Sequence, residues 1–216
     1  MIDMQLAEVL QKVSIWAVPI LLAVTLHEAA HGYAARLNGD NTAWMLGRVT
    51  LNPLKHIDLL GTIIIPLLML LISPFIFGWA KPVPVNFRQL RRKTLGPIIV
   101  AAAGPAANLF LALASVALLY VFPHVPATIQ EPMGLTLIAS IQINVLLMVF
   151  NMMPILPLDG GRIVESLLPG PLSYQYAKTE RYGMIIVLIL AFSGILFAVI
   201  KPIMVFILDL LLNLAP

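Results

Sequence analysis

Two histidines four residues apart flank a glutamate in the sequence HEAAH, as His27, Glu28 and His31. On a helix, positions i and i+4 share one face, so both imidazoles can reach a single ion. Glu28 lies next to that face, where it can hold a water at the open position of the metal and accept its proton. Imidazole and carboxylate ligands without thiolate suit zinc best, although other divalent ions also accept them. The motif therefore predicts a metal site with a general base beside it.

A zinc site of this kind needs a third protein ligand, which must be His, Asp or Glu because the chain has no cysteine. The candidates are His56, Asp58, His124, Glu131, Asp159 and Glu165. Asp159 stands out because it follows a break at the end of an apolar run. Pro154 and Pro157 stop the helix there, and Gly160–Gly161 permits a tight turn. A carboxylate in an irregular segment at membrane depth is tolerated only where it lines a cavity or meets a partner.

The elements that must position these residues are strongly apolar. The 216-residue chain is 60% hydrophobic and 11% charged, with a mean hydropathy of +0.97. A soluble domain would be nearer half apolar and about a quarter charged, so the sequence predicts a membrane protein in contact with the lipid bilayer. The net charge is +3, but Lys and Arg gather in two connecting regions, as they do in loops that face the cytoplasm. The basicity therefore indicates no nucleic-acid partner.

Long runs with few or no charges predict membrane-spanning helices at residues 13–35, 96–122, 135–153 and 183–200. Residues 59–80 are also uncharged, and Pro66 and Pro74 are compatible with a bent, re-entrant or hairpin segment. The tail, residues 201–216, is apolar apart from its first residue and one aspartate, and it could span obliquely or lie in the interface.

These segments predict an all-α polytopic membrane protein with about five to six membrane segments. Short β-strands are expected near the active site, for which RVTL at 48–51 and VPVN at 83–86 are the candidates. No internal repeat or linker divides the chain. We therefore expect a single domain over 1–216, with a catalytic core at about 14–168 and C-terminal membrane segments at 183–216.

The candidate ligands also restrict the topology. His27 and His31 lie in the second half of their span, and Asp159 follows the end of its own span, so an even number of crossings must separate them. This condition is met if residues 59–80 do not cross. The same arrangement places most of the Lys and Arg residues on one side, as the positive-inside rule requires. It predicts an active site nearer the cytoplasmic face and an external N-terminus.

The chain resembles the site-2 proteases, a family of intramembrane zinc metalloproteases. Three family motifs occur in the family's order: HExxH at 27–31, GxxxN at 104–108 and NxxPxxPxDG at 151–160. The resemblance is to a compact prokaryotic branch without PDZ or CBS domains, and it implies a location in the cell membrane. It implies that Asp159 is the third zinc ligand and Glu28 the general base. It also implies that Asn108 and Asn151 line the site, where they orient the substrate or stabilise the oxyanion.

The predicted function is hydrolysis of peptide bonds in membrane-embedded substrates, which are transmembrane proteins, by a zinc-activated water with one Zn²⁺ per chain. The main alternative is a non-enzymatic divalent-metal-binding membrane protein or transporter. Transporters usually show paired repeats with interrupted helices, and none is visible in this sequence. A catalytically inactive scaffold is a third reading. A membrane zinc hydrolase acting on prenylated proteins would share HExxH, but not the arrangement of Asn, Pro, Asp and Gly around Asp159.

Overall fold

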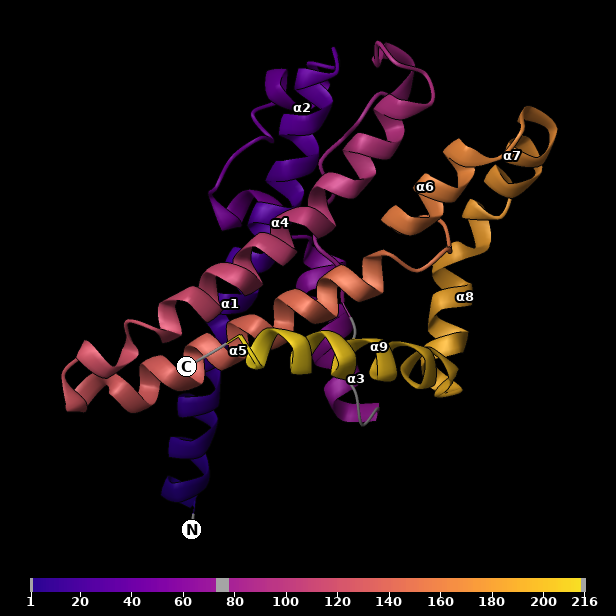
Figure 1. The fold of residues 1–216 in the computed structure, drawn as a ribbon. Helices are drawn as coiled ribbons and strands as arrows, with labels where there is room; N and C mark the ends of the chain where they lie inside the picture. The colour runs from indigo at the N-terminus through magenta and orange to yellow at the C-terminus, as the bar shows by residue number, and fades with distance from the viewer. Residues whose placement is uncertain (1, 73–77, 215–216) are drawn as a thin grey trace.

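The computed structural model describes residues 2–72 and 78–214 (Figure 1). The longer helices are α1 (Ile2–Leu37), α4 (Leu95–Leu119), α5 (Ala127–Asn151), α8 (Glu180–Phe192) and α9 (Ile195–Leu212). The shorter ones are α2 (Thr42–Met45), α3 (Ile65–Ile72), α6 (Asp159–Leu167) and α7 (Gly170–Ala177). Single turns of 3₁₀-helix lie at Pro53–His56, Phe87–Gln89 and Phe122–His124, and a π-helix covers Leu59–Ile64.

Four of the described helices are long and apolar enough to cross a membrane: Leu10–Leu37, Leu95–Leu119, Ala127–Asn151 and Ile195–Leu212. The first three lie close to the spans expected at 13–35, 96–122 and 135–153. The chain is therefore an all-helical, multi-pass membrane protein.

The span expected at 183–200 is wrong, because the chain turns in the middle of it. Gly194 has a φ of +78°, a left-handed conformation that ends α8 after 13 residues. Helix α9 then begins at Ile195 and continues through most of the tail. The fourth helix that could span is therefore α9, which includes residues expected to form a separate tail segment. Glycine adopts positive φ without the Cβ clash of other residues, so it suits this position.

Helix α4 packs against both α1 and α5, and α9 packs along α5 (Figure 1). A cluster of buried apolar side chains joins the later helices, and it includes Val116, Val145, Val187 and Ile200. Helix α6 lies against α4, which brings the start of α6 to the α1–α4 pair. This arrangement carries the three sequence motifs to one region of the bundle.

The segment around 59–80 turns back on itself in its described part. The backbone N–H of Trp79 donates to the carbonyl of Gly61 at 3.0 Å, and Thr62 Oγ1 donates to the carbonyl of Trp79 at 2.9 Å. A Cβ at Gly61 would collide with the Trp79 indole, so glycine is required for this close approach. Residues 73–77, which include Pro74 of the expected re-entrant segment, lie outside the described residues.

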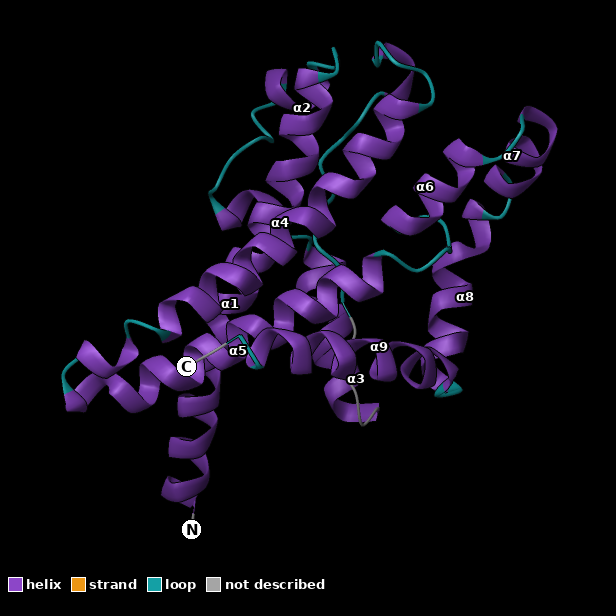
Figure 2. Ribbon diagram, in the orientation of Figure 1, coloured by secondary structure: helices purple, strands orange, loops and turns teal. Residues whose placement is uncertain are grey.

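The short β-strands expected at 48–51 and 83–86 are not found, since residues 2–72 and 78–214 contain no strand (Figure 2). The Arg48 guanidinium, at the start of the first stretch, instead donates to the carbonyls of Lys81 and Pro82, just before the second stretch, at 2.9 and 3.3 Å. Proline has no N–H to offer to a ladder, and residues 82 and 84 are both proline. The second stretch therefore lies extended without pairing as a strand.

Candidate metal centre

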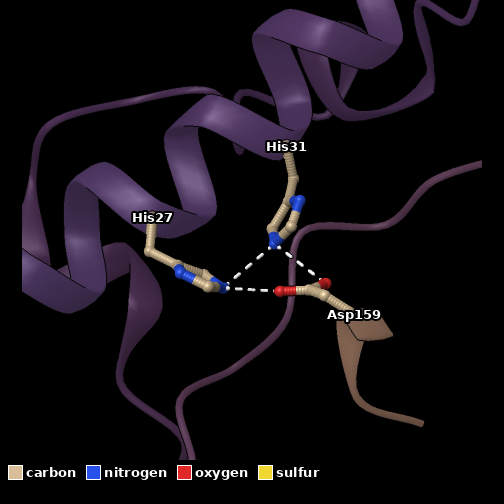
Figure 3. A group of neighbouring side chains, drawn as sticks. All are labelled: His27, His31 and Asp159. Carbon is tan, nitrogen blue, oxygen red and sulfur yellow. Dashed lines mark hydrogen bonds and ion pairs between the residues drawn. The ribbon is translucent and has the colours of Figure 1, made fainter. Parts of the chain in front are cut away.

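Helix α1 places both histidines of HEAAH on its buried face. His27 and His31 lie one turn apart, and their Nε2 atoms are 3.0 Å from each other (Figure 3). Both residues are less than 9% exposed. The i, i+4 spacing thus brings the two imidazoles together as the sequence predicts.

Asp159 completes the group from the first residue of α6. Its Oδ2 lies 3.3 Å from His27 Nε2, and its Oδ1 lies 3.3 Å from His31 Nε2 (Figure 3). In the described part of the chain these three residues form the one group of His, Asp or Glu side chains close enough to share a metal ion. The other candidates for the third ligand are not part of this group: His56, Asp58, His124, Glu131 and Glu165.

The hydrogen bonds on the far side of each imidazole fix which nitrogen carries the proton. His31 Nδ1 lies 2.7 Å from the carbonyl of Val100, which can only accept, so Nδ1 is the donor. His27 Nδ1 lies 2.7 Å from Asn108 Oδ1 and donates to it. In the neutral rings both Nε2 atoms therefore present lone pairs to each other and to Asp159.

A divalent cation fits this arrangement of donors. Asp159 Oδ2 is buried without a hydrogen-bond partner, and the ligand atoms of the three residues all lie within 4.8 Å of one another. Zinc–nitrogen bonds of about 2.0–2.1 Å would separate neighbouring tetrahedral ligands by about 3.3 Å. The observed separations of 3.0 and 3.3 Å are close to that value. Three ligands would leave a fourth position for water or substrate, as catalytic zinc sites do.

Gly104 of α4 lies directly against the histidines. A Cβ at this position would lie 2.5 Å from His31 Nε2 and 2.6 Å from His27 Nε2. Any side chain here would fill the space where the ligand atoms converge. The glycine of the GxxxN motif therefore leaves room for the metal as well as for close helix packing.

The irregular segment 152–158 sets the position of Asp159 by folding back onto the first turn of α6. A Cβ at Gly160 would collide with the carbonyl of Met152, and one at Gly161 would lie 2.5 Å from the backbone of Ile155. From the other side, Gly183 of α8 packs directly on the carbonyl of Leu156. These glycine contacts allow the loop to pack tightly between two helices.

The electrostatics of Asp159 follow from its neighbours. Burial alone would raise the pKa of the Asp159 carboxyl, but hydrogen bonds and positive charge from His27 and His31, when these rings are protonated, outweigh burial and hold this pKa below its ordinary value. The carboxylate is thus the stable form of Asp159 at neutral pH, which is the form that binds a cation.

Glu28 is held by a backbone group from a distant segment. Its Oε2 accepts a hydrogen bond of 2.7 Å from the N–H of Val83. Val83 lies between Pro82 and Pro84, so its N–H is the one backbone donor among these three residues. The two flanking prolines mark the Val83 N–H as an isolated backbone donor in the sequence. Nothing in the sequence indicates that this N–H contacts Glu28.

Asn108 lies behind His27 and is fully buried. Its amide nitrogen donates to the carbonyl of Ala23 at 3.2 Å and to Asn144 Oδ1 at 2.9 Å. Asn144 in turn donates to the carbonyl of Ser140 at 2.8 Å. This direction of donation turns Asn108 Oδ1 toward His27. Asn144 was not singled out from the sequence, although a polar residue within a span is itself a signal of interhelical bonding.

Asn151 lies at the C-terminal end of α5 and is half-buried. Its side-chain amide donates to the carbonyl of Leu147 at 2.9 Å, one turn back along the same helix. The expected role of Asn108 and Asn151 in supporting the substrate or the oxyanion stays a prediction.

An apolar cavity of about 380 Å³ lies between α1, α5, α9 and the segment that folds back at Trp79. Its lining includes Thr25, which is two residues from His27, together with Leu147 and Ile200. His56 also lines it and is held through Nε2 at 3.0 Å from the carbonyl of Thr50. The cavity offers mostly hydrocarbon surface, with a few polar groups.

Comparisons with known proteins agree with this site. The model of peptidase family M50 matches residues 123–194. A Bacillus subtilis protein named "Putative zinc metalloprotease YwhC" is 37% identical over 185 residues, which cover 80% of this chain and 78% of that protein. Two proteins named "Putative zinc metalloprotease Rip2" are also similar. The one from Mycolicibacterium smegmatis is 32% identical and that from Mycobacterium tuberculosis strain H37Rv 29%, and each alignment covers 79% of this chain and 63% of the relative.

No solved structure matches the chain. The relationship to YwhC extends over most of both proteins, and the metalloprotease names accord with the His-His-Asp group. Zinc is therefore the metal that this group is expected to hold. The chain belongs to peptidase family M50, the site-2 type of zinc metalloprotease.

Proposed function

We propose that this metalloprotease hydrolyses peptide bonds of transmembrane protein substrates within the bilayer, with Glu28 as the general base. The observation that carries the proposal is that Asp159 converges with His27 and His31, which lie on a helix able to span a membrane. Ionisable groups inside a span are expensive unless they serve a function. Residues 1–216 would act as one catalytic domain, with the core at about 14–168.

In this mechanism His27, His31 and Asp159 would hold zinc, which when bound would supply Lewis-acid polarisation of the scissile carbonyl and a lowered pKa of water. Glu28 accepts the proton of the attacking water and delivers it to the leaving amine as the C–N bond breaks. The Val83 N–H holds the Glu28 carboxylate in place for both transfers. Asn108 and the Val100 carbonyl keep the two imidazoles oriented with Nε2 toward the centre.

The apolar cavity beside α1 and α5 is an observation in favour of a membrane-embedded substrate. Its lining is mostly aliphatic and aromatic, which matches the side chains of a transmembrane segment. A helical substrate must unwind locally before cleavage, because its carbonyls are already hydrogen-bonded within the helix.

The proposed topology has five to six membrane segments, with 59–80 re-entrant and the metal centre nearer the cytoplasmic face of the cell membrane. The bonds from Gly61 and Thr62 to Trp79 support a segment that leaves and returns on one side. Reporter fusions at Thr42 and Arg91 should then report the same side. Fusions that report opposite sides would contradict this topology.

The test of the function compares wild-type protein with Glu28→Gln and His27→Ala in the same host membranes. Glu28→Gln should retain stoichiometric zinc but cause single-span proteins to accumulate uncleaved, as measured by membrane proteomics. His27→Ala should lose both zinc and cleavage. A Glu28→Gln protein that still cleaves would overturn the role of Glu28. Wild-type protein that binds no zinc after reconstitution would overturn the proposed mechanism.

A further inference from the structure

A second, strongly cationic cleft lies at the C-terminal end of α1, away from the three metal-binding side chains. It has a volume of about 700 Å³, and its lining includes Tyr33, Arg36, Leu37, Asn41, Gln89 and Arg91. None of these residues has a role in the proposed chemistry. The cleft therefore needs an explanation of its own.

The cleft lies at a boundary of the membrane. Helix α1 ends at Leu37, and α4 begins at Leu95, four residues after Arg91. Both helices are long and apolar enough to span, and they pack against each other. The end of one span and the start of the next therefore meet at the level where lipid headgroups lie.

The two arginines of the cleft have no acidic partner among the residues that the structure describes. The ion pairs there involve His27, His31 and Arg162. The nearest carboxylate in sequence is Asp40, which is fully buried. Asp40 accepts from the N–H of Thr42 at 2.9 Å and from that of Asn86 at 2.7 Å. The positive charge of Arg36 and Arg91 is thus not balanced by a carboxylate of the described residues, and it is available to an external anion.

The Arg36 guanidinium and the Arg91 backbone are each held by a neighbouring group. The Arg36 guanidinium lies 3.4 Å from the centre of the Trp44 ring, and Trp44 also contacts Tyr33 edge-on. Arg91 is fixed through its backbone N–H, which donates to the carbonyl of Asn38 at 2.8 Å. Gly39 has a φ of +106°, and a Cβ there would lie 2.9 Å from Arg91 Cγ. The turn at Gly39 thus makes room for the stem of Arg91.

The rim of the cleft is apolar and exposed. Leu37 is 80% exposed, and beside it α2 carries the half-exposed Trp44 and Met45, which is 81% exposed. Tryptophan and tyrosine favour the interface between hydrocarbon and water. A small soluble anion makes no favourable contact with this apolar rim. An amphiphilic anion can bind the arginines through its charged group and the rim through its hydrocarbon.

We propose that this cleft binds the phosphate of an anionic phospholipid headgroup, with Arg36 and Arg91 as the charged contacts. The guanidinium fork matches the geometry of phosphate oxygens and can donate two hydrogen bonds to them. Basic clefts between spans on the cytoplasmic side are suited to anionic headgroups. The binding requires only that the protein lies in a bilayer, and it does not depend on the proteolytic mechanism.

The test uses purified full-length protein in phosphatidylcholine bilayers with a trace of spin-labelled phosphatidylglycerol or spin-labelled phosphatidylcholine. Electron paramagnetic resonance measures the fraction of each label that the protein immobilises. The wild type should prefer phosphatidylglycerol. Replacing both arginines (Arg36→Gln, Arg91→Gln) should reduce this preference by roughly tenfold or more, since each arginine near the surface contributes about fivefold.

A matched control changes the same net charge in the same region. Arg88→Gln with Arg92→Gln removes two exposed arginines that do not line the cleft, and it should retain most of the preference. Arg36→Lys with Arg91→Lys keeps the charge but loses the fork, so its preference should be intermediate. The zinc content of every variant must match the wild type, which shows that the fold is intact.

Three results would overturn the proposal. The first is equal immobilisation of both lipids by the wild type. The second is an equal loss in the Arg88/Arg92 control, which would indicate a diffuse charge effect rather than a site. The third is complete loss of lipid preference in millimolar inorganic phosphate at constant ionic strength, which would assign the cleft to a soluble anion.

Discussion

The N–H of Val83 donates to Glu28 Oε2 at 2.7 Å, which ties the proposed general base on α1 to an extended segment 55 residues further along the chain. A carboxylate on a helix surface would otherwise be free to rotate among several rotamers. The hydrogen bond selects one of them. Val83 is therefore a positioning residue for Glu28.

Replacing Val83 with proline should slow catalysis with little effect on substrate binding. The substitution removes the N–H, and a hydrogen bond to a charged group contributes about 1.5–3 kcal/mol, so kcat should fall by about 10- to 100-fold. KM should change little, because the lost bond acts on Glu28. Val83→Ala keeps the donor and should stay within severalfold of wild type in the same assay. Equal losses in both variants would instead indicate a packing role for the Val83 side chain.

Replacing Gly104 with alanine should impair metal binding. The new Cβ would lie 2.5 Å from His31 Nε2, so the imidazoles must move apart from their present positions. We expect zinc affinity to fall by about 10-fold or more, measured by competition with a fluorescent chelator. Ala106→Val adds bulk to an exposed face of the same helix and should bind zinc as the wild type does. Unchanged affinity in Gly104→Ala would show that the group can relax without loss.

Asn108→Leu should weaken zinc binding through the tautomer of His27. It removes the acceptor for Nδ1–H and leaves that buried proton without a partner. Loss of such an outer contact typically costs about 10- to 100-fold in metal affinity. Asn108→Asp keeps an acceptor oxygen and should restore much of the affinity. If Asn108→Leu lowers only kcat while zinc affinity is unchanged, the role in substrate or oxyanion support is the better explanation.

Gly183→Ala should destabilise the protein and displace the loop that carries Asp159. The added methyl group would collide with the carbonyl of Leu156, and overpacking of this kind costs about 1–3 kcal/mol. The melting temperature should fall by several degrees, and zinc content should fall with it. Gly170→Ala is the control, because a Cβ at Gly170 meets no atom within 4 Å. Equal melting temperatures for the two variants would contradict tight packing of α8 on the loop.

The local features of the candidate metal centre could be predicted from the sequence, whereas the meeting of Asp159 with two histidines far earlier in the chain is a long-range contact. The spacing of His27 and His31 sets their common face on any helix, and the prolines and glycines around Asp159 mark a break at the end of a span. The structure brings Asp159 to the histidines, although the roles assigned to the individual site residues remain predictions. Zinc and the protease family are shown by the comparisons.

The parts that the sequence did not predict depend on contacts between distant segments. Val83 and Asn144 lie 55 and 36 residues from the side chains that they contact, Glu28 and Asn108. The expected strand at 83–86 ignored the missing donor of Pro84. The sequence does not reveal Gly194 as the end of a helix, because glycine is common inside membrane helices. Its left-handed conformation cannot be read from a hydropathy pattern.

The buried Asp40 carboxylate connects the turn after α1 to α2 and to the segment that contains Val83 and Arg91. One buried carboxylate accepts from the N–H of Thr42, at the start of the short helix that carries Trp44, and from that of Asn86, which lies between Val83 and Arg91 in the chain. Loss of this carboxylate would release the support of Glu28 and the walls of the cationic cleft at the same time. In a deep mutational scan, Asp40 should therefore be as intolerant of substitution as the three proposed zinc ligands, although it is not one of them.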